Sequence, residues 1–471
     1  MTDYTIVDPT YHRYHIETET APDIVPWPSR FKVDVKRVGL ARLLLSELIH
    51  YRGDLDTVLS RPCTYGVFSG PLGGFTPREE HCVGCLRCTM QYPEFVQIRH
   101  NPARASMGDS YFTAAQVGAV AYEAESGRVP VKGAGYRGRF GGEGWDGMWT
   151  DMSEIVRPTR DGIHGREFIS TAVDLGSKPS FLTFGPSGQL TGERPEAFLI
   201  PLPFIFDPPP RKSSSAPLFR ILSEASRQIE TLAVLPVRAI LEYDLHGDHL
   251  VPLVGAADVE RIETFQDPPR MVEMDGWDAD LYRRLLTAFP DSAICLRDPF
   301  SGPGPWLEAF HAGVHIFHLT ADYHGRGVDD SFIHDLIREA HQTFVGACLR
   351  DQITLIGSGG LIAAEHIPKA IIAGLDAAAV DTALLVALQA EFDGECKDPE
   401  TSTFRLPAGL DDGWGVKRLK NLSAAWRDQL LEILGAMGLR EVRRLRGETG
   451  RAMYQVDLER EAFAGIEGYH A

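Results

Sequence analysis

From about residue 178 onward, short apolar runs alternate with stretches in which apolar positions recur at helical spacing. Apolar runs of about four to eight residues bounded by turn residues are typical of buried strands, and recurrence every three to four residues is typical of helices packed on a sheet. The predicted strands are 201–206, 231–235, 239–243, 250–254, 270–273, 293–297, 315–320, 353–357 and 377–380. The predicted helices are 218–230, 278–288, 306–312, 331–348, 365–373 and 383–389.

This alternation predicts an α/β fold, a (β/α)8 TIM-type barrel, because each strand–helix unit adds one parallel strand to the ring. The runs 239–243 and 250–254 are treated as one irregular β region, which leaves a helix missing near the second unit. Further helices are predicted at 35–50, 113–125 and 421–437, the last closed by Gly438. The predicted domains are a leader (1–60), a ferredoxin-like cysteine module (61–100), a connecting region with a Gly-rich loop at 133–144 (101–177), the barrel (178–395) and a helical tail (396–471).

Charge and composition narrow the class of protein. The chain has 471 residues and a formal net charge of −18, which argues against nonspecific nucleic-acid binding and against docking on anionic membranes. The N-terminus lacks a signal pattern, and the longest apolar run, 377–390, is interrupted by Asp381 and too short to span a bilayer. Seven cysteines, three of them in one motif, favour a reduced, cytoplasmic setting over a disulfide scaffold.

That motif is Cys82-x-x-Cys85-x-x-Cys88, followed by Tyr92-Pro93. It resembles the C-x2-C-x2-C-x3-C-P run of bacterial ferredoxins, with Tyr92 at the place of the fourth cysteine. Cys63 is the best candidate for the fourth ligand, which favours a [4Fe–4S] cluster. A [3Fe–4S] cluster on three cysteines, a zinc site with a His81 or Cys63 ligand, and a metal-free remnant remain open.

The stretches 356–361 (Ile-Gly-Ser-Gly-Gly-Leu) and 373–385 resemble the FMN-binding synthase domain of glutamate synthases, and the similarity extends over about 178–450. The cysteine module resembles insertions in archaeal-type members. The resemblance implies FMN, whose phosphate such barrels hold at the ends of the seventh and eighth strands. The implied cofactor-binding residues are Phe206, Gly357, Ser358, Gly359, Gly360, Thr382 and Ala383. Tight turn packing is the alternative interpretation of these glycines.

The chain departs from the family pattern around the reaction pocket. Asp381 replaces the glycine before the threonine, and a carboxylate there repels a phosphate unless it points away. The family's lysine on the fifth strand is replaced by Arg297, and its Gly-rich segment after the sixth strand is replaced by 321–327. The candidate catalytic residues are Arg297, Tyr323, His324 and Arg326, with His318 and Asp322 as weaker candidates. The alternatives are a salt bridge from Arg297 to Asp298 or Asp322, and a loop packed by its own side chains.

We therefore expect a flavin-dependent, iron–sulfur oxidoreductase that reduces or oxidises a small amino acid, imine or carboxylated substrate. An electron-transfer or scaffold subunit with a degenerate barrel, and a non-redox barrel, are the alternatives. No G-x-G-x-x-G follows a strand to bind a dinucleotide, so we expect an electron-donor protein or reductase subunit as partner.

Overall fold

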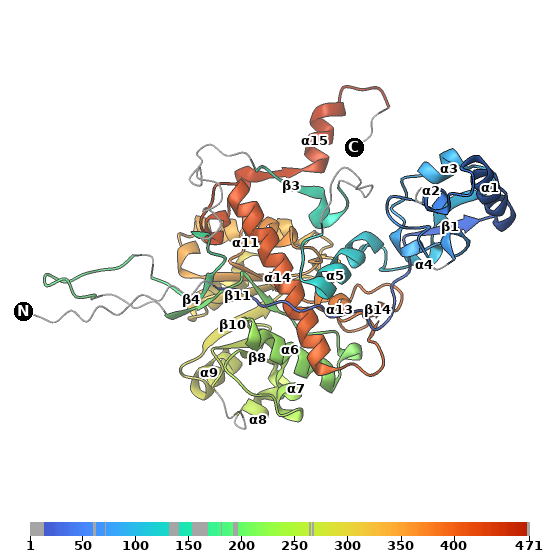
Figure 1. Cartoon of the computed structure of the whole chain (residues 1–471). Helices are drawn as coiled ribbons and strands as arrows, with labels where there is room; N and C mark the ends of the chain where they lie inside the picture. The colour runs from blue at the N-terminus through green and yellow to red at the C-terminus, as the bar shows by residue number, and fades with distance from the viewer. Residues whose placement is uncertain are drawn as a thin grey trace, which may run out of the picture. The chain divides into compact units, whose positions relative to one another are not determined.

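The computed structural model describes residues 14–59, 63–70, 72–130, 141–152, 168–179, 181–191, 196–262, 265 and 268–468. The Gly-rich loop predicted at 133–144 lies largely outside these residues. The described chain divides into two compact units, one over residues 23–115 and a larger one that contains the barrel. Figure 1 shows both, with the smaller unit in blue. No described helix has the length and apolarity needed to cross a bilayer.

The larger unit is a closed barrel of eight parallel strands, as the alternation predicted. In order around the ring these are β6 (Phe204–Phe206), β7 (Ala233–Pro236), β8 (Leu250–Val254), β9 (Met271–Asp275), β10 (Ala293–Asp298), β11 (Ile316–Thr320), β12 (Thr354–Ser358) and β13 (Ala377–Val380). Most of their residues are buried, which is what strands covered on both faces require.

Helices follow the strands and cover the barrel (Figure 1). They are α6 (Ala216–Gln228), α7 (Val237–Glu242), α8 (Val259–Ile262), α9 (Ala279–Ala288), α10 (Pro303–His311), α11 (Ile333–Gly346), α12 (His366–Ala373) and α13 (Thr382–Ala387). The strand predicted at 239–243 is wrong, because α7 occupies it and supplies the helix that was missing. Its buried Val237, Ala239 and Ile240 keep helical spacing, and Arg, Ala, Leu and Glu are strong helix formers.

A long helix, α14 (Asp412–Ala436), packs against α6 and begins well before the predicted residue 421. Its buried Arg418 and Asn421 donate to backbone carbonyls that lie far away in the sequence. Arg418 Nη1 reaches Ala21 O at 2.9 Å, and Asn421 Nδ2 reaches Glu19 O at 2.7 Å. Residues near the start of the chain and α14 are therefore joined by buried hydrogen bonds.

The smaller unit is built on a two-stranded antiparallel sheet, β1 (Phe31–Val35) with β2 (Val96–His100). Its helices are α1 (Arg37–His50), α2 (Leu55–Leu59), α3 (Arg87–Gln91) and α4 (Pro102–Ala105), and α5 (Ala114–Ser126) begins at its end. A small core of Phe31, Val33, Val67 and Cys82 holds the sheet against the cysteine-bearing loops. The remaining described strands form short antiparallel pairs: β3 (Met148–Thr150) with β16 (Ala452–Tyr454), β4 (Val173–Ser177) with β5 (Glu196–Ile200), and β14 (Glu391–Phe392) with β15 (Phe404–Arg405).

A buried carboxylate ties the C-terminal region to the barrel. Asp376, just before β13, accepts from Arg350 Nη2 at 2.7 Å and from Arg446 Nη1 at 3.0 Å, and it also accepts from the Leu355 amide. Burial alone would raise the pKa of Asp376, but the two guanidinium groups outweigh it and lower the pKa below its usual value. The ionised carboxylate is therefore part of the folded state.

We expect Asp376→Ala to lower the free energy of unfolding by about 3–5 kcal/mol, because Arg350 would be left buried without its counter-charge. Asp351→Ala is the matched control, since exposed Asp351 pairs with the same Arg446 at 2.7 Å and its loss should cost less than about 1 kcal/mol. Urea unfolding followed by circular dichroism measures both. Equal losses of unfolding free energy in the two variants would contradict a stabilising role for the ion pairs of Asp376.

Candidate functional site

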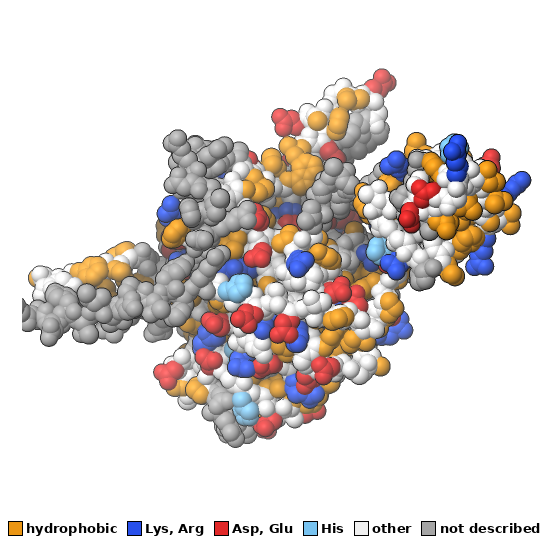
Figure 2. Space-filling model, viewed as in Figure 1, with side chains coloured by type: hydrophobic (Ala, Val, Ile, Leu, Met, Phe, Trp, Pro, Cys, Tyr) orange, Lys and Arg blue, Asp and Glu red, His pale blue; other side chains and the backbone are white. Residues whose placement is uncertain are grey.

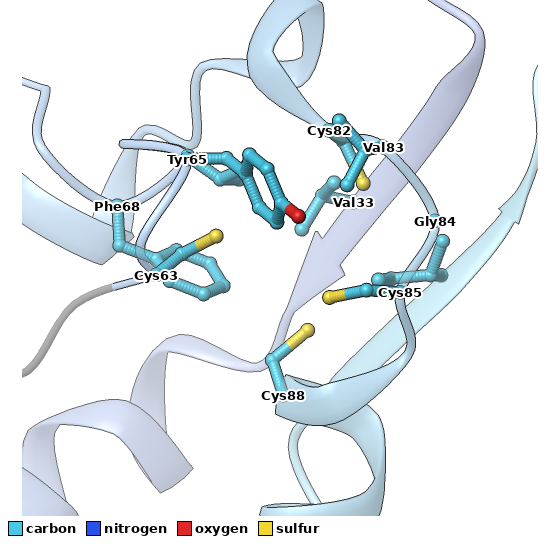
Figure 3. Close-up of a pocket in the computed structure, with 11 residues that line it drawn as sticks. Val33, Cys63, Tyr65, Phe68, Cys82, Val83, Gly84, Cys85 and Cys88 are labelled. Carbon is cyan, nitrogen blue, oxygen red and sulfur yellow. The ribbon is translucent and has the colours of Figure 1, made fainter. Parts of the chain in front are cut away.

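Four cysteine side chains converge in the smaller unit. Cys63 comes from the segment after α2, whereas Cys82, Cys85 and Cys88 come from the loop that leads into α3. All four line one pocket, and Figure 3 shows their sulfurs pointing toward one another. The structure thus brings together the four thiols that the sequence nominated; that they hold a metal stays a prediction.

The wall of this pocket is apolar and includes Val33, Val67, Phe68 and Ile98. Burial raises the pKa of the Cys82 and Cys88 thiols, and the neighbouring thiolates raise both further. The Gly84 and Thr89 amides oppose this by donating to Cys82 and Cys88. Such hydrogen bonds to sulfur, together with low exposure, are what tune an iron–sulfur cluster.

Gly84 is required for this loop on steric grounds. Its φ is +68°, and an added Cβ would lie 2.4 Å from Cζ of Phe31. Only glycine combines the left-handed backbone with this close approach to the core, so the loop packs tightly between its two flanking cysteines.

Two other residues of the motif lie away from the thiols. The ring of His81 contacts the carbonyl of Tyr65 through Nδ1 at 3.2 Å, and His81 is not among the residues that line the pocket. Tyr92 packs on Phe95, with ring centroids 5.2 Å apart. Of the two zinc ligands considered, the geometry therefore favours Cys63, and four thiolates suit both a [4Fe–4S] cluster and a zinc ion held by sulfur alone.

The open end of the barrel holds a second polar cluster, centred on Arg297 at the end of β10. Its guanidinium pairs with both carboxylate oxygens of Asp207, at 2.7 and 2.8 Å, and with Glu273 at 3.1 Å. The alternative interpretation of Arg297 as a salt-bridge residue had named Asp298 or Asp322 as its partner, and the structure shows Asp207 and Glu273 instead. Asp207 follows β6 on the opposite side of the ring, and Glu273 lies in the neighbouring β9. The positive charge of Arg297 is thus already balanced within the protein.

Two more side chains extend this cluster to the next strands. His318 on β11 approaches Glu273 through Nδ1 at 2.8 Å and Ser358 on β12 through Nε2 at 3.1 Å. His318 and Glu273 are fully buried. Burial would raise the pKa of Asp207, but the charges of Arg297 and His318 lower it below its ordinary value. The barrel end therefore contains a continuous hydrogen-bonded layer in which the Asp207 carboxylate is ionised.

Asp381, the unexpected residue of the implied phosphate corner, is buried at the end of β13. Its carboxylate caps the first amide of α13, that of Thr382. Burial, and next the negative charge of Asp207, raise its pKa to about 7. At neutral pH the side chain is therefore poised between its charged and neutral forms.

Most other polar groups of the implied phosphate site already make hydrogen bonds within the protein. The Gly360 amide donates to Tyr323 O at 3.1 Å, and the Gly359 carbonyl accepts from Trp145 Nε1 at 3.1 Å. The Thr382 hydroxyl is buried beside Asp381, whose pKa it helps to lower, and it makes no hydrogen bond of acceptable geometry, so it is an available donor. A phosphate accepts from such a donor when Asp381 is neutral, whereas an ionised Asp381 repels it.

Three predicted cofactor residues lie in packing positions. Gly357 faces Leu375, since an added Cβ would lie 2.9 Å from Leu375 Cδ1, which agrees with the alternative of tight packing. Phe206 ends β6 beside Val380, and Ala383 lies inside α13; both are fully buried. Their role in binding a cofactor stays a prediction.

The candidate catalytic residues in the loop after β11 lie in two different environments. Asp322 accepts from the backbone amides of His324 and Arg326, and the Arg326 guanidinium donates to Asp330 O while it lies over the Phe332 ring. Arg326 thus packs within its own loop, as the alternative interpretation had it. Tyr323 is buried, and its pKa is raised well above the usual value by burial and by the charges of Asp381 and Asp207.

Asp207, Glu273 and Trp145 were missed as site residues from the sequence. The first two had a usable signal, because Asp207 directly follows the predicted strand 201–206 and Glu273 ends the strand 270–273, where barrels carry functional groups. Trp145 had none, since its contact with Gly359 spans a sequence separation of 214 residues.

Comparison with known proteins finds sequence similarity to glutamate synthases. The family model described as "Conserved region in glutamate synthase" matches residues 333–401, which include Ser358–Gly360 and Asp381–Thr382. The chain is 24% identical over 441 residues to "Archaeal-type glutamate synthase [NADPH]" of Dehalococcoides mccartyi, covering 79% of this chain and 86% of that protein. The chain is therefore similar in sequence to glutamate synthases.

Two further matches are a curated relative and a solved structure. "Archaeal glutamate synthase [NADPH]" of Archaeoglobus fulgidus is 23% identical over 498 residues, which cover 87% of this chain and 94% of the relative. Among solved structures, a mandelate oxidase variant with 2-hydroxy-phenylacetamide has a TM-score of 0.42 at 12% identity, over 74% of this chain and 91% of that one.

We expect the thermal stability of the protein to fall as pH rises from 6 to 8, and Asp381→Asn to reduce that fall. The folded-state pKa of Asp381, about 7, lies above the unfolded value, so its contribution to stability is complete below the unfolded pKa and is lost as pH rises through 7. Melting temperatures at a series of pH values measure this. The melting temperature of the exposed Asp291→Asn variant should depend on pH as that of the parent does. The same pH dependence in the parent and in Asp381→Asn would refute a raised pKa for Asp381.

Proposed function

We propose that this chain is a flavin oxidoreductase of the glutamate synthase type whose electrons enter through an iron–sulfur cluster on Cys63, Cys82, Cys85 and Cys88. The observation that carries the proposal is the convergence of these four thiols in one apolar pocket of a chain whose other unit is a glutamate synthase-like barrel. The curated relatives, named as NADPH glutamate synthases, support the reaction class.

The proposed flavin is FMN, bound at the corner formed by Ser358, Gly359, Gly360 and Thr382. When bound, FMN supplies hydride or single-electron transfer, for which the protein provides orientation and electrostatics. The available hydroxyl of Thr382 supports this location. Because Asp381 lies next to that hydroxyl, the proposal implies that Asp381 takes up a proton when the phosphate binds.

The residues at the barrel end then have distinct roles. Arg297 pairs with the two buried carboxylates of Asp207 and Glu273 and keeps their side chains in one geometry, and its charge lowers the pKa of Asp207. Tyr323 stays protonated at physiological pH, so its hydroxyl is a hydrogen-bond donor near Asp381. The substrate class that follows from the glutamate synthase likeness is a small amino acid, imine or carboxylated compound.

A second candidate function is an electron-transfer or scaffold subunit whose barrel has lost its reaction. The buried layer from Asp207 through Arg297 to Ser358 favours it, because groups that would otherwise meet a substrate are bonded to one another. The two candidates differ in flavin content: the enzyme binds FMN and the scaffold does not.

The cluster is tested on protein purified without oxygen. We expect about four iron and four sulfide per chain and an EPR signal after reduction with dithionite. Cys63→Ser should lower the iron content and change the signal, since it removes a ligand. Cys348→Ser, which alters an exposed cysteine of the barrel unit, should leave both unchanged. Colourless, iron-free parent protein would contradict the proposal, and bound zinc would replace it with a structural site.

The flavin is tested by FMN titration at pH 6 and pH 8, followed by quenching of flavin fluorescence. We expect the affinity of the parent to fall about tenfold over this range, as Asp381 becomes charged beside the phosphate. Asp381→Asn should bind FMN with little pH dependence. Asp298→Asn, which alters a half-buried carboxylate at another strand end, should behave like the parent. No binding by any variant would favour the scaffold function.

A further inference from the structure

The thiol pocket is bordered by exposed apolar side chains. Val83 and Leu86 flank Cys85 and are 37% and 41% exposed, and Met90 in α3 is 81% exposed. Leu86 and Met90 lie one helical turn apart, because the Met90 amide donates to Leu86 O at 2.9 Å. Cys85 itself is exposed. One side of the thiol cluster is thus exposed to solvent beside an apolar strip made of Val83, Leu86 and Met90.

The backbone at this strip is in a conformation that leucine rarely adopts. Leu86 has a φ of +61°, in the left-handed region, where bulky residues are strained. The strain is not offset by burial, since the side chain is 41% exposed. This backbone conformation, together with the exposure of the side chain, presents an apolar group to the solvent next to Cys85.

Positive charge borders the same strip. Arg87 adjoins Leu86, and Arg78 begins the segment that leads to Cys82; both are exposed. Among the described residues, neither has a carboxylate partner, whereas Lys32 and Arg99 of the same unit are paired with Glu79 and Asp34. Arg78 and Arg87 therefore present uncompensated charge to the solvent.

The smaller unit as a whole differs in charge from the rest of the chain. Residues 23–115 contain eleven Lys or Arg and nine Asp or Glu, although the full chain has 47 and 65. The whole acidic excess thus lies outside this unit. Figure 2 shows blue and orange side chains, with some red ones among them, on the surface of the part that Figure 1 draws in blue. A basic and apolar surface is complementary to an acidic partner with an apolar patch.

We propose that the strip of Val83, Leu86 and Met90, with Arg78 and Arg87, docks a small acidic one-electron carrier protein. The inference rests on the cluster of the proposed function. In the transfer the reduced centre of the carrier loses one electron and the cluster gains it, with no bond made or broken. Electron-transfer complexes are small and short-lived, which a narrow apolar strip with bordering charges suits.

The test follows reduction of the cluster by a reduced two-cluster ferredoxin and, separately, by a reduced flavodoxin, both acidic carriers, in stopped-flow absorbance. We expect a second-order rate constant that falls steeply with added salt. Arg78→Glu with Arg87→Glu should lower it about tenfold or more at low salt. Met90→Asp should lower it at every salt concentration. Arg284→Glu, an exposed arginine of α9, should react like the parent.

Reduction by dithionite separates this proposal from the previous one. A parent protein that contains no iron and sulfide lacks the cluster, so the proposed function fails. If dithionite reduces every variant but the carriers reduce Arg78→Glu/Arg87→Glu as fast as the parent, the docking site is overturned. A parent that is a dimer in solution, and that Met90→Asp converts to a monomer, would show that the strip binds a second copy instead.

Discussion

The guanidinium of Arg297 lies at the open end of the barrel, and two buried carboxylates depend on it directly. Asp207 follows β6, which lies across the ring from the Arg297 strand, and Glu273 lies on the neighbouring β9. The ion pairs therefore join strands that are not all adjacent. A buried charge without its partner is strongly destabilising. The closed barrel therefore depends on this arginine as well as on apolar packing. The same pairs limit the chemistry that remains available, because the Arg297 guanidinium is already bonded to carboxylates. Burial raises the pKa of Asp381 and the charge of Asp207 raises it further, whereas Arg297 lowers it.

The barrel was predictable from the sequence because its strands are apolar runs and its helices keep regular spacing. The error at 239–243 arose where a short helix and a short strand carry the same apolar residues. The partners of Arg297 were not predictable in this way. Asp298 is next in sequence, but successive residues of a strand point to opposite faces, and its carboxylate lies near Trp306 instead. Asp207 is 90 residues away and meets Arg297 only when the ring closes.

The cysteine site was predictable for a different reason. Three of its thiols are placed by local spacing alone, and the fourth was found because ferredoxin-type sites accept a ligand from a distant segment. What the sequence did not reveal is how the site is built into the fold. Cys82 belongs to the small core with Phe31, Val33 and Val67, so a candidate ligand is also a core residue. In a unit with so little apolar core, binding of a metal and folding are expected to be coupled.

Trp145 makes the barrel dependent on residues that precede it. Its indole holds the carbonyl of Gly359, and its own carbonyl accepts from Lys369 Nζ at 2.7 Å in α12. The neighbouring Asp146 contacts His366 at 3.0 Å. A fragment that starts at the first barrel strand would thus leave a buried lysine and a buried histidine without these partners. The eight-stranded ring is a unit of topology, but we expect it to be destabilised when it is separated from the segment around Trp145.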